Sequence, residues 1–232
     1  MDPIKYRFVI VFLVAAFLME FGVLKSMAAD YFPLQVGNSW TYSPSYGDKG
    51  DRVDSITGKE EVSSTPTYIW NRQEAPDDNY NEKRWLAQDD DYLKIYKISS
   101  NEDIDPPVIF TPPWNMFKLN PVVGDSWIFE GDLGSFYVKS TFYVESTTES
   151  ITVSAGIFSN CIRVRELNEI TVGGSTEYEY EKKWYAPDVG LIIDRKYTEN
   201  WNSVKMSQEL VSFSISKIQK PMPGIPLLLL DE

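Results

Sequence analysis

The stretch VGNSWTY, residues 36–42, decides how this chain folds, because it returns as VGDSWIF at residues 123–129. A second stretch, EKRWLAQD at residues 82–89, returns as EKKWYAPD at residues 181–188. The two pairs keep the same order at an offset of about 85 to 100 residues, which indicates an internal duplication. The repeated residues are of the kinds that form turns and cores. They therefore predict an architecture and not a chemistry.

The first 29 residues have the layout of a secretory signal peptide. Lys5 and Arg7 precede an unbroken apolar run, Phe8–Leu18, and the small residues at the two ends of Ser26–Ala28 offer a cleavage site. The apolar run is too short to cross a hydrocarbon core roughly 30 Å thick. An uncleaved anchor that extends to Leu24 is the alternative. We expect export to the periplasm or the extracellular space, with no stable membrane span after cleavage.

The composition argues against several classes of function. The chain of 232 residues carries a formal net charge of −12 and contains no histidine and one cysteine, Cys161. The negative charge disfavours nucleic acid and anionic lipid surfaces as partners. Without histidine there is no Ser-His-Asp or Cys-His nucleophile system and no imidazole ligand for zinc. We expect no enzyme activity, no cofactor and no metal site, and a buried, inert Cys161.

Alternating sequence patterns predict an all-β fold. In Phe136–Glu145, the even positions read Phe, Val, Ser, Phe and Val, as in a strand with one buried face. Glu177–Tyr185 alternates in the same way, and we expect Tyr178, Tyr180 and Trp184 on its buried side. Further strands are predicted at residues 39–42, 51–56, 67–71, 82–87, 92–98, 126–130, 157–165, 191–197 and 204–218.

The turns and the repeat predict how these strands are connected. The glycine of each VGNSW or VGDSW motif favours a tight turn with positive φ that delivers a tryptophan to the core. Ala186–Gly190 predicts a hairpin, and the proline pairs within Ile104–Trp114 predict a connection or an edge strand. We expect one antiparallel β-domain at residues 30–219, with repeats at about 31–113 and 117–219. The two units would form one curved sheet or a flattened barrel.

The Pro/Leu-rich tail, residues 220–232, contains four consecutive leucines at Leu227–Leu230. Four leucines exposed on a free end would favour association between molecules. We expect them to cover an apolar groove of the same molecule, and recognition of a partner is the alternative.

Three stretches together are similar to a known family. They are YFPLQVGNSWTY at residues 31–42, AGIFSNCIRV at 155–164 and KWYAPDVGLI at 183–192. In this order they resemble the DUF3108-like group, exported bacterial β-proteins of unknown function. The resemblance covers residues 31 to about 197 and implies an exported β-fold, but it implies no catalytic residue. Asp188 stands where the family usually shows glycine, which leaves the turn type open but not the hairpin.

The tryptophans fall into two groups. Four of them recur in the repeated motifs and are expected to fill the core of the repeats: Trp40, Trp85, Trp127 and Trp184. The unpaired Trp70, Trp114 and Trp201 are the candidates for ligand binding. Stacking of sugars on these three rings would make the protein a carbohydrate-binding module.

Two acidic clusters are weaker candidates for a site. Glu177, Glu179 and Glu181 fall on one face of a strand about 7 Å apart, a spacing compatible with glycoside hydrolysis. The simpler hypothesis is that they form a solubilising outer face. Asp89–Asp91 could offer oxygens to Ca²⁺, although the glycine and terminal glutamate of an EF-hand loop are missing. A solvated turn is the simpler hypothesis there.

These observations predict a non-enzymatic protein of the cell envelope that binds an apolar small molecule or an envelope protein. A curved sheet with a concave face would suit lipid-like cargo, an expectation that rests on analogy between folds. A carbohydrate-binding module is the alternative, and a carboxylate-dependent glycoside hydrolase is a weaker one.

Overall fold

The structure, a computed structural model, describes residues 29–47, 50–74, 80–102 and 104–216. Strands make up most of this part of the chain, and its one helical element is a short 3₁₀ helix. The elements are β1 (Ser39–Tyr46), β2 (Arg52–Val62), β3 (Thr65–Glu74), β4 (Tyr80–Gln88), β5 (Tyr92–Ser100), β6 (Val108–Lys118), β7 (Ser126–Leu133), β8 (Phe136–Val153), β9 (Gly156–Val172), β10 (Ser175–Ala186), β11 (Gly190–Tyr197), η1 (Glu199–Trp201) and β12 (Val204–Ser214).

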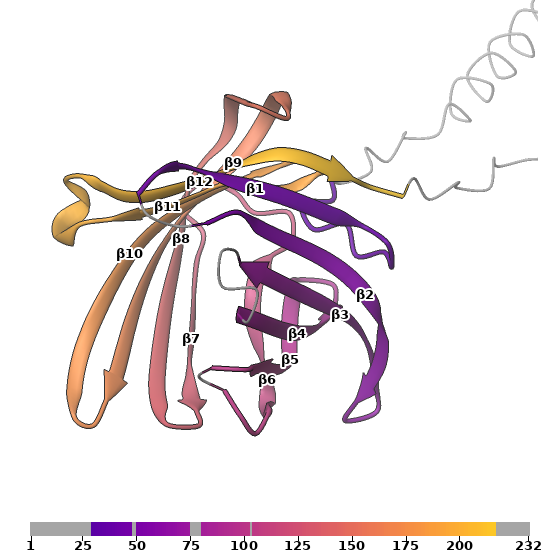
Figure 1. The fold of residues 1–232 in the computed structure, drawn as a ribbon, viewed down its shortest axis with the longest axis vertical. Coiled ribbons are helices and arrows are strands. Elements are labelled where there is room, and N and C mark those ends of the chain that lie inside the picture. Colours follow the sequence, from indigo (N-terminus) through magenta and orange to yellow (C-terminus); the bar gives the residue numbers. More distant parts are fainter. Residues whose placement is uncertain (1–28, 48–49, 75–79, 103, 217–232) are drawn as a thin grey trace, which may run out of the picture.

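The twelve strands form one antiparallel sheet in the order β6-β5-β4-β3-β2-β1-β12-β11-β10-β9-β8-β7. Each half of the chain is therefore a six-stranded meander. The two meanders join where β1 pairs with β12, with Ser39 opposite Ser214. The sheet curls until its two outer strands, β6 and β7, approach each other, which gives a nearly closed barrel (Figure 1). The all-β class with two repeated units is confirmed.

The first repeated motif begins both meanders. VGNSW leads into β1 and VGDSW leads into β7, and the turn glycines Gly37 and Gly124 have φ angles of 95° and 94°. Each glycine donates its backbone N–H to the second strand of its own meander. Gly37 bonds to the carbonyl of Ile56 at 2.9 Å, and Gly124 bonds to the carbonyl of Val144 at 3.0 Å. The positive φ predicted for this turn is confirmed, and it is the conformation that glycine adopts without a steric cost.

The second repeated motif lies on β4 and β10, the fourth strand of each meander. The indole N–H of Trp85 donates to Glu60 on β2 at 2.8 Å, and that of Trp184 donates to Glu149 on β8, also at 2.8 Å. Because β2 and β8 are the second strands of their meanders, the duplication extends to side-chain hydrogen bonds. The four tryptophans of the repeated motifs are all buried.

Aromatic rings close the join between β6 and β7, which we call the seam. Trp114 on β6 stacks on Phe129 of β7 with ring centroids 3.4 Å apart, and Phe110 meets the same ring edge-on at 5.6 Å. Further along, Phe117 contacts Trp127 at 6.3 Å. Strand β6 contains one of the two proline pairs, and it is an edge strand, as its prolines predicted.

The prediction that the acidic residues of β10 form an outer face is wrong for Glu179 and Glu181, although Glu177 is exposed. Glu181 is 5% exposed, whereas Tyr178, expected on the buried side, is 50% exposed. Alternate residues of a strand face opposite sides of the sheet. Glu179, Glu181 and Lys183 accordingly line the interior of the barrel. The physical reason is that this interior is charged, and Lys183 and Lys196 neutralise Glu181 there.

Two predictions fall outside the described residues. These are the signal peptide, apart from its last position, and the docking of Leu227–Leu230 onto an apolar groove. Within the described ranges, no helix has the length and apolar character needed to cross a membrane.

Candidate functional site

The barrel contains a cavity of about 670 Å³ with two chemically different sides. Apolar side chains from β5 to β8, the strands nearest the seam, form what we call the apolar wall: Ile95, Ile98, Trp114, Met116, Leu133, Val138 and Phe142. Polar side chains from β2 to β4 and from β9 to β12 form what we call the polar wall: Arg52, Arg72, Glu74, Glu82, Arg84, Glu166, Asn168, Glu179, Glu181, Lys183, Asp194, Lys196 and Gln208. The division is not complete, because the polar Ser100 and Ser140 lie on strands of the apolar wall, Glu102 follows β5, and the apolar Ile170 and Met206 lie on strands of the polar wall. The strand order places the polar wall away from the seam.

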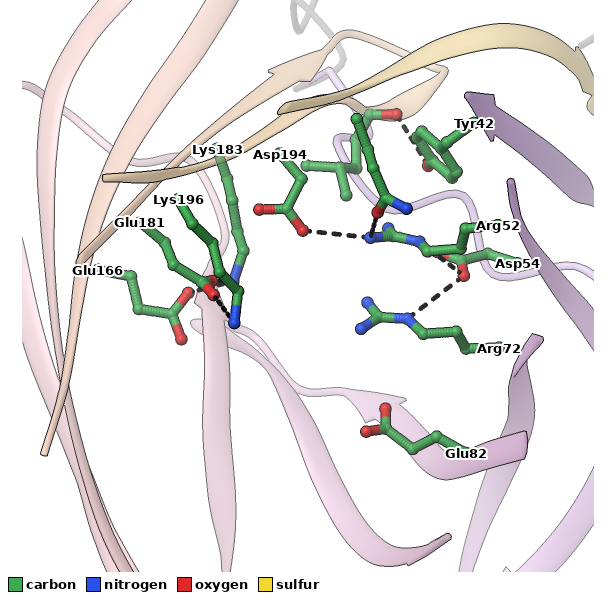
Figure 2. Close-up of polar contacts among 12 residues, drawn as sticks. Tyr42, Arg52, Asp54, Arg72, Glu82, Glu166, Glu181, Lys183, Asp194 and Lys196 are labelled. Carbon is green, nitrogen blue, oxygen red and sulfur yellow. Dashed lines mark hydrogen bonds and ion pairs between the residues drawn. The ribbon is translucent and has the colours of Figure 1, made fainter. Parts of the chain in front are cut away.

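Arg52 is the centre of the first charged group on the polar wall (Figure 2). Its Nε and Nη2 donate to the two carboxylate oxygens of Asp54 at 3.1 and 2.9 Å. Its Nη1 donates to Asp194 at 3.1 Å and to Gln208 at 3.3 Å. Burial would lower the pKa of Arg52, but the charge of Asp54 outweighs this and raises the pKa above its ordinary value. The arginine is therefore permanently charged, and it ties β2 to β11 and β12 across the junction of the meanders.

Lys183 and Lys196 hold the second charged group (Figure 2). Lys183 contacts Glu166, and it contacts Glu181 at 2.6 Å. Lys196 contacts Glu181 at 3.2 Å and Glu179 at 2.8 Å. Burial would raise the pKa of Glu181, but the two lysines hold that pKa well below its usual range. At Glu166, burial together with the charge of Glu181 outweighs Lys183, and the pKa is raised.

The second repeated motif supplies a matching ion pair to each meander. Glu82 contacts Arg84 at 2.6 Å on β4, and Glu181 contacts Lys183 at the same distance on β10. Burial would raise the pKa of Glu82, but Arg84 and Arg72 lower it to about 2. The tryptophan of this motif was recognised from the sequence, but the ion pair was not. The available signal was the order Glu-Lys-Arg/Lys directly before each tryptophan, in EKRW and EKKW.

Two arginines lie against the indole ring of Trp70. The guanidinium carbons of Arg72 and Arg84 are 5.0 and 4.8 Å from the ring centroid. Arg72 contacts Asp54 through Nε at 3.5 Å, and Arg84 contacts Glu82 through Nε at 2.6 Å. Both arginines line the main cavity and also a smaller pocket of about 50 Å³, which is mostly apolar.

The three tryptophans predicted to bind ligand do not form one stacking platform. Trp70 lines the smaller pocket and Trp114 lines the main cavity, so both face the interior. Trp201 lies in η1, where it contacts Tyr180 and Tyr197. Tyr180 alternates along β10 with the residues that line the cavity, which places Trp201 on the outer side of the barrel.

Cys161 is buried, as expected, and it is not part of the cavity lining. Burial raises the pKa of its thiol to about 11, so little thiolate exists at neutral pH. In the described part of the chain, no group of three or more histidine, cysteine, aspartate or glutamate side chains has an arrangement that could hold a metal ion.

The family comparison agrees with the resemblance noted in the sequence. Residues 144–210 match the model of the DUF3108-like family. The matched segment runs from β8 to β12 and includes both lysines of the second charged group. No curated protein gives a significant match.

Two crystal structures resemble the barrel. One, described as "a putative lipoprotein" from Parabacteroides distasonis ATCC 8503, is 18% identical with a TM-score of 0.51, over 81% of this chain and 99% of that one. The other, described as "a putative exported protein with YmcC-like fold" from Bacteroides fragilis NCTC 9343, is 16% identical with a TM-score of 0.48, over 80% and 99% of the two chains. At 18% identity, the likeness to the structure from Parabacteroides distasonis is one of fold alone. The resemblance of this chain to the DUF3108-like family is thus confirmed over residues 144–210.

Proposed function

We propose that the protein is an exported, non-enzymatic binding protein that holds a small amphipathic molecule inside its barrel. The observation that carries the proposal is the division of the cavity into an apolar wall and a polar wall. A purely apolar ligand would cover charged groups without offering them polar partners, which is unfavourable. A purely polar ligand would leave the apolar wall in contact with water. A molecule with a polar head and an apolar body satisfies both walls.

The size of the cavity supports this proposal. Its volume of about 670 Å³ lies within the range of roughly 300–1,000 Å³ that small-molecule sites occupy. The signal-peptide pattern of the first 29 residues supports export, which would expose the protein to lipids and other amphiphiles of the cell envelope.

The polar wall favours binding over catalysis because its charged groups neutralise one another. Glu179 and Glu181, the two interior members of the trio considered for glycoside hydrolysis, both contact Lys196. A general acid needs a raised pKa, and the pKa of Glu181 is lowered. Glu166 has a raised pKa, but its carboxylate contacts Lys183 directly.

Fluorescence titration of residues 30–232 with N-phenyl-1-naphthylamine, an uncharged apolar probe, tests the proposal. Val138→Phe adds bulk on the apolar wall, and the matched control, Ile128→Phe, adds the same bulk at an exposed position on β7. We expect the first variant to bind at least about 10-fold more weakly and the second to bind like the unaltered protein. Urea unfolding verifies that both variants fold, since overpacking alone costs roughly 1–3 kcal/mol. Equal binding by the two variants, or no binding by the unaltered protein, contradicts the proposal.

A further inference from the structure

We propose that the polar head of the ligand is an anion, a carboxylate or a phosphate, held by Arg72 and Arg84 beside Trp70. This inference rests on the proposed function and adds the charge of the head group and its position. It is carried by the geometry of the two arginines and by the η nitrogens that donate no hydrogen bond.

Neighbouring strands place the two arginines at one spot. Arg84 on β4 is the cross-strand partner of Trp70 on β3, and Arg72 lies two residues beyond Trp70 on the same face. Each guanidinium lies about 5 Å from the indole centroid, at 5.0 and 4.8 Å. Contact with an aromatic ring orients a guanidinium while leaving the N–H groups at its rim available. The site is therefore preorganised.

Arg52 shows how a structural arginine is bonded in the same wall. Its Nε and both of its η nitrogens donate hydrogen bonds. Arg72 and Arg84 each pair with one carboxylate, and Nε is the closest atom of the guanidinium in both pairs. Among the described residues, the η nitrogens of these two arginines donate no hydrogen bond, unlike those of Arg52. Because a guanidinium carries five N–H donors, most donors of both side chains are available to a ligand.

The carboxylates that pair with the two arginines also bind other groups, since Asp54 binds Arg52 and Glu82 accepts from Tyr80. Asp54 is shared between Arg52 and Arg72, and Glu82, the cross-strand partner of Arg72, pairs with Arg84. Figure 2 shows the terminal nitrogens of Arg72 directed into the space between the two charged groups. Across that space each lysine already contacts two carboxylates. Carboxylate and phosphate groups can accept two parallel hydrogen bonds from the forked donors of an arginine, whereas a lysine acts as a single point charge. The two arginines therefore suit a carboxylate or a phosphate.

The apolar body of the ligand then has one suitable place. Met116, on the apolar wall, lines the main cavity together with Arg72 and Arg84. The smaller pocket beside the same arginines, at about 50 Å³, is too small for an alkyl chain of ordinary length. When the head group of the ligand is bound by the arginines, its apolar body therefore lies along the apolar wall of the main cavity.

Competition among amphiphiles with the same ten-carbon chain tests the inference. Decanoate, decyl phosphate, decanol and decyltrimethylammonium are used to displace N-phenyl-1-naphthylamine from residues 30–232. The experiment compares the unaltered protein with Arg72→Gln, Arg84→Gln and the control Arg163→Gln. Arg163 forms two ion pairs, with Glu145 and Glu149, and does not line the cavity.

We expect both anions to bind the unaltered protein and the control at least about 10-fold more tightly than decanol. In Arg72→Gln and Arg84→Gln, the affinity for the two anions should fall to that for decanol, and the affinity for decanol should not change. Equal binding of all four amphiphiles overturns this inference and leaves the proposed function standing. Failure of all four to displace the probe contradicts the proposed function itself.

Three further results decide the remaining possibilities. Tightest binding of decyltrimethylammonium would overturn the assignment of an anion. Displacement by inorganic phosphate alone would place a free anion, and not a head group, in the site. If a glutamine variant fails to fold, Arg72→Lys and Arg84→Lys take its place, because lysine retains the positive charge but lacks the forked donors of the guanidinium. These lysine variants should bind the two anions more weakly and bind decanol with unchanged affinity. Undiminished anion binding in these lysine variants would contradict the inference.

Discussion

Replacing Glu82 with glutamine tests whether the ion pairs inside the barrel stabilise it. Glu82 is buried on β4 and contacts Arg84 at 2.6 Å. Burial would raise its pKa, but Arg84 and Arg72 lower it from an ordinary value of 4.5 to about 2. A carboxyl group whose pKa is lower in the folded state contributes stability above its unfolded pKa. That contribution disappears as the pH falls through the folded pKa.

The magnitude follows from the size of the pKa change. A fall from 4.5 to about 2 corresponds to about 3 kcal/mol at roughly 1.36 kcal/mol per unit. Glutamine resembles the protonated carboxyl group, so Glu82→Gln should lower the free energy of unfolding by about 3 kcal/mol at pH 7. The difference should shrink below pH 4.5 and be nearly absent close to pH 2, where Glu82 of the unaltered protein is itself protonated.

Urea unfolding followed by tryptophan fluorescence, at several pH values from 7 down to 3, measures this difference. Glu61→Gln is the matched control, since Glu61 is exposed on β2. The reasoning is refuted if the two variants have the same stability at pH 7. It is also refuted if the loss in Glu82→Gln does not change with pH.

Two further predictions concern neighbouring features of the barrel. Glu166→Gln should raise the free energy of unfolding at pH 7, because burial and Glu181 raise the pKa of Glu166 and so disfavour its ionised form. The gain should vanish below pH 4.5, and a loss measured in urea at pH 7 contradicts it. Trp85→Ala and Trp184→Ala should each cost about 3–5 kcal/mol, since each removes a buried ring. A neutral effect of either substitution on the urea midpoint would show that the ring does not hold its repeat together.

The architecture could be predicted because its determinants are local. Gly37 and Gly124 mark the same turn in two copies, and each copy is followed by strands with visible alternation. The side of a strand that faces inward was harder to predict. At β10 both faces carry large side chains, with Tyr178 and Tyr180 on one and Glu181 and Lys183 on the other. Alternation gives the period of a strand, but it does not show which face is enclosed.

The charged site could not be predicted because its partners are distant in sequence. Arg52 is bonded to Asp194 and Gln208, which lie 142 and 156 residues away along the chain. A charged face usually indicates contact with water, and only the register of β2, β11 and β12 shows that these charges meet one another. Of the tryptophans predicted to bind ligand, Trp70 and Trp114 do line the interior, but nothing in the sequence distinguished them from the outer Trp201.

In a barrel whose strands are all joined by backbone hydrogen bonds, the number of strands and their stagger fix the diameter. In the described part of this barrel, ladders join every neighbouring pair from β6 round to β7, and β6 meets β7 through side chains such as Trp114 and Phe129. Among the described strands, the barrel is thus joined by backbone ladders everywhere except at the seam. We expect the apolar side, where this join lies, to accommodate contents of different bulk more readily than β3 and β4, which carry the arginines and have a ladder on both sides. Selectivity should then be strict for the head group and tolerant for chain length, which displacement by eight-carbon to fourteen-carbon carboxylates would reveal.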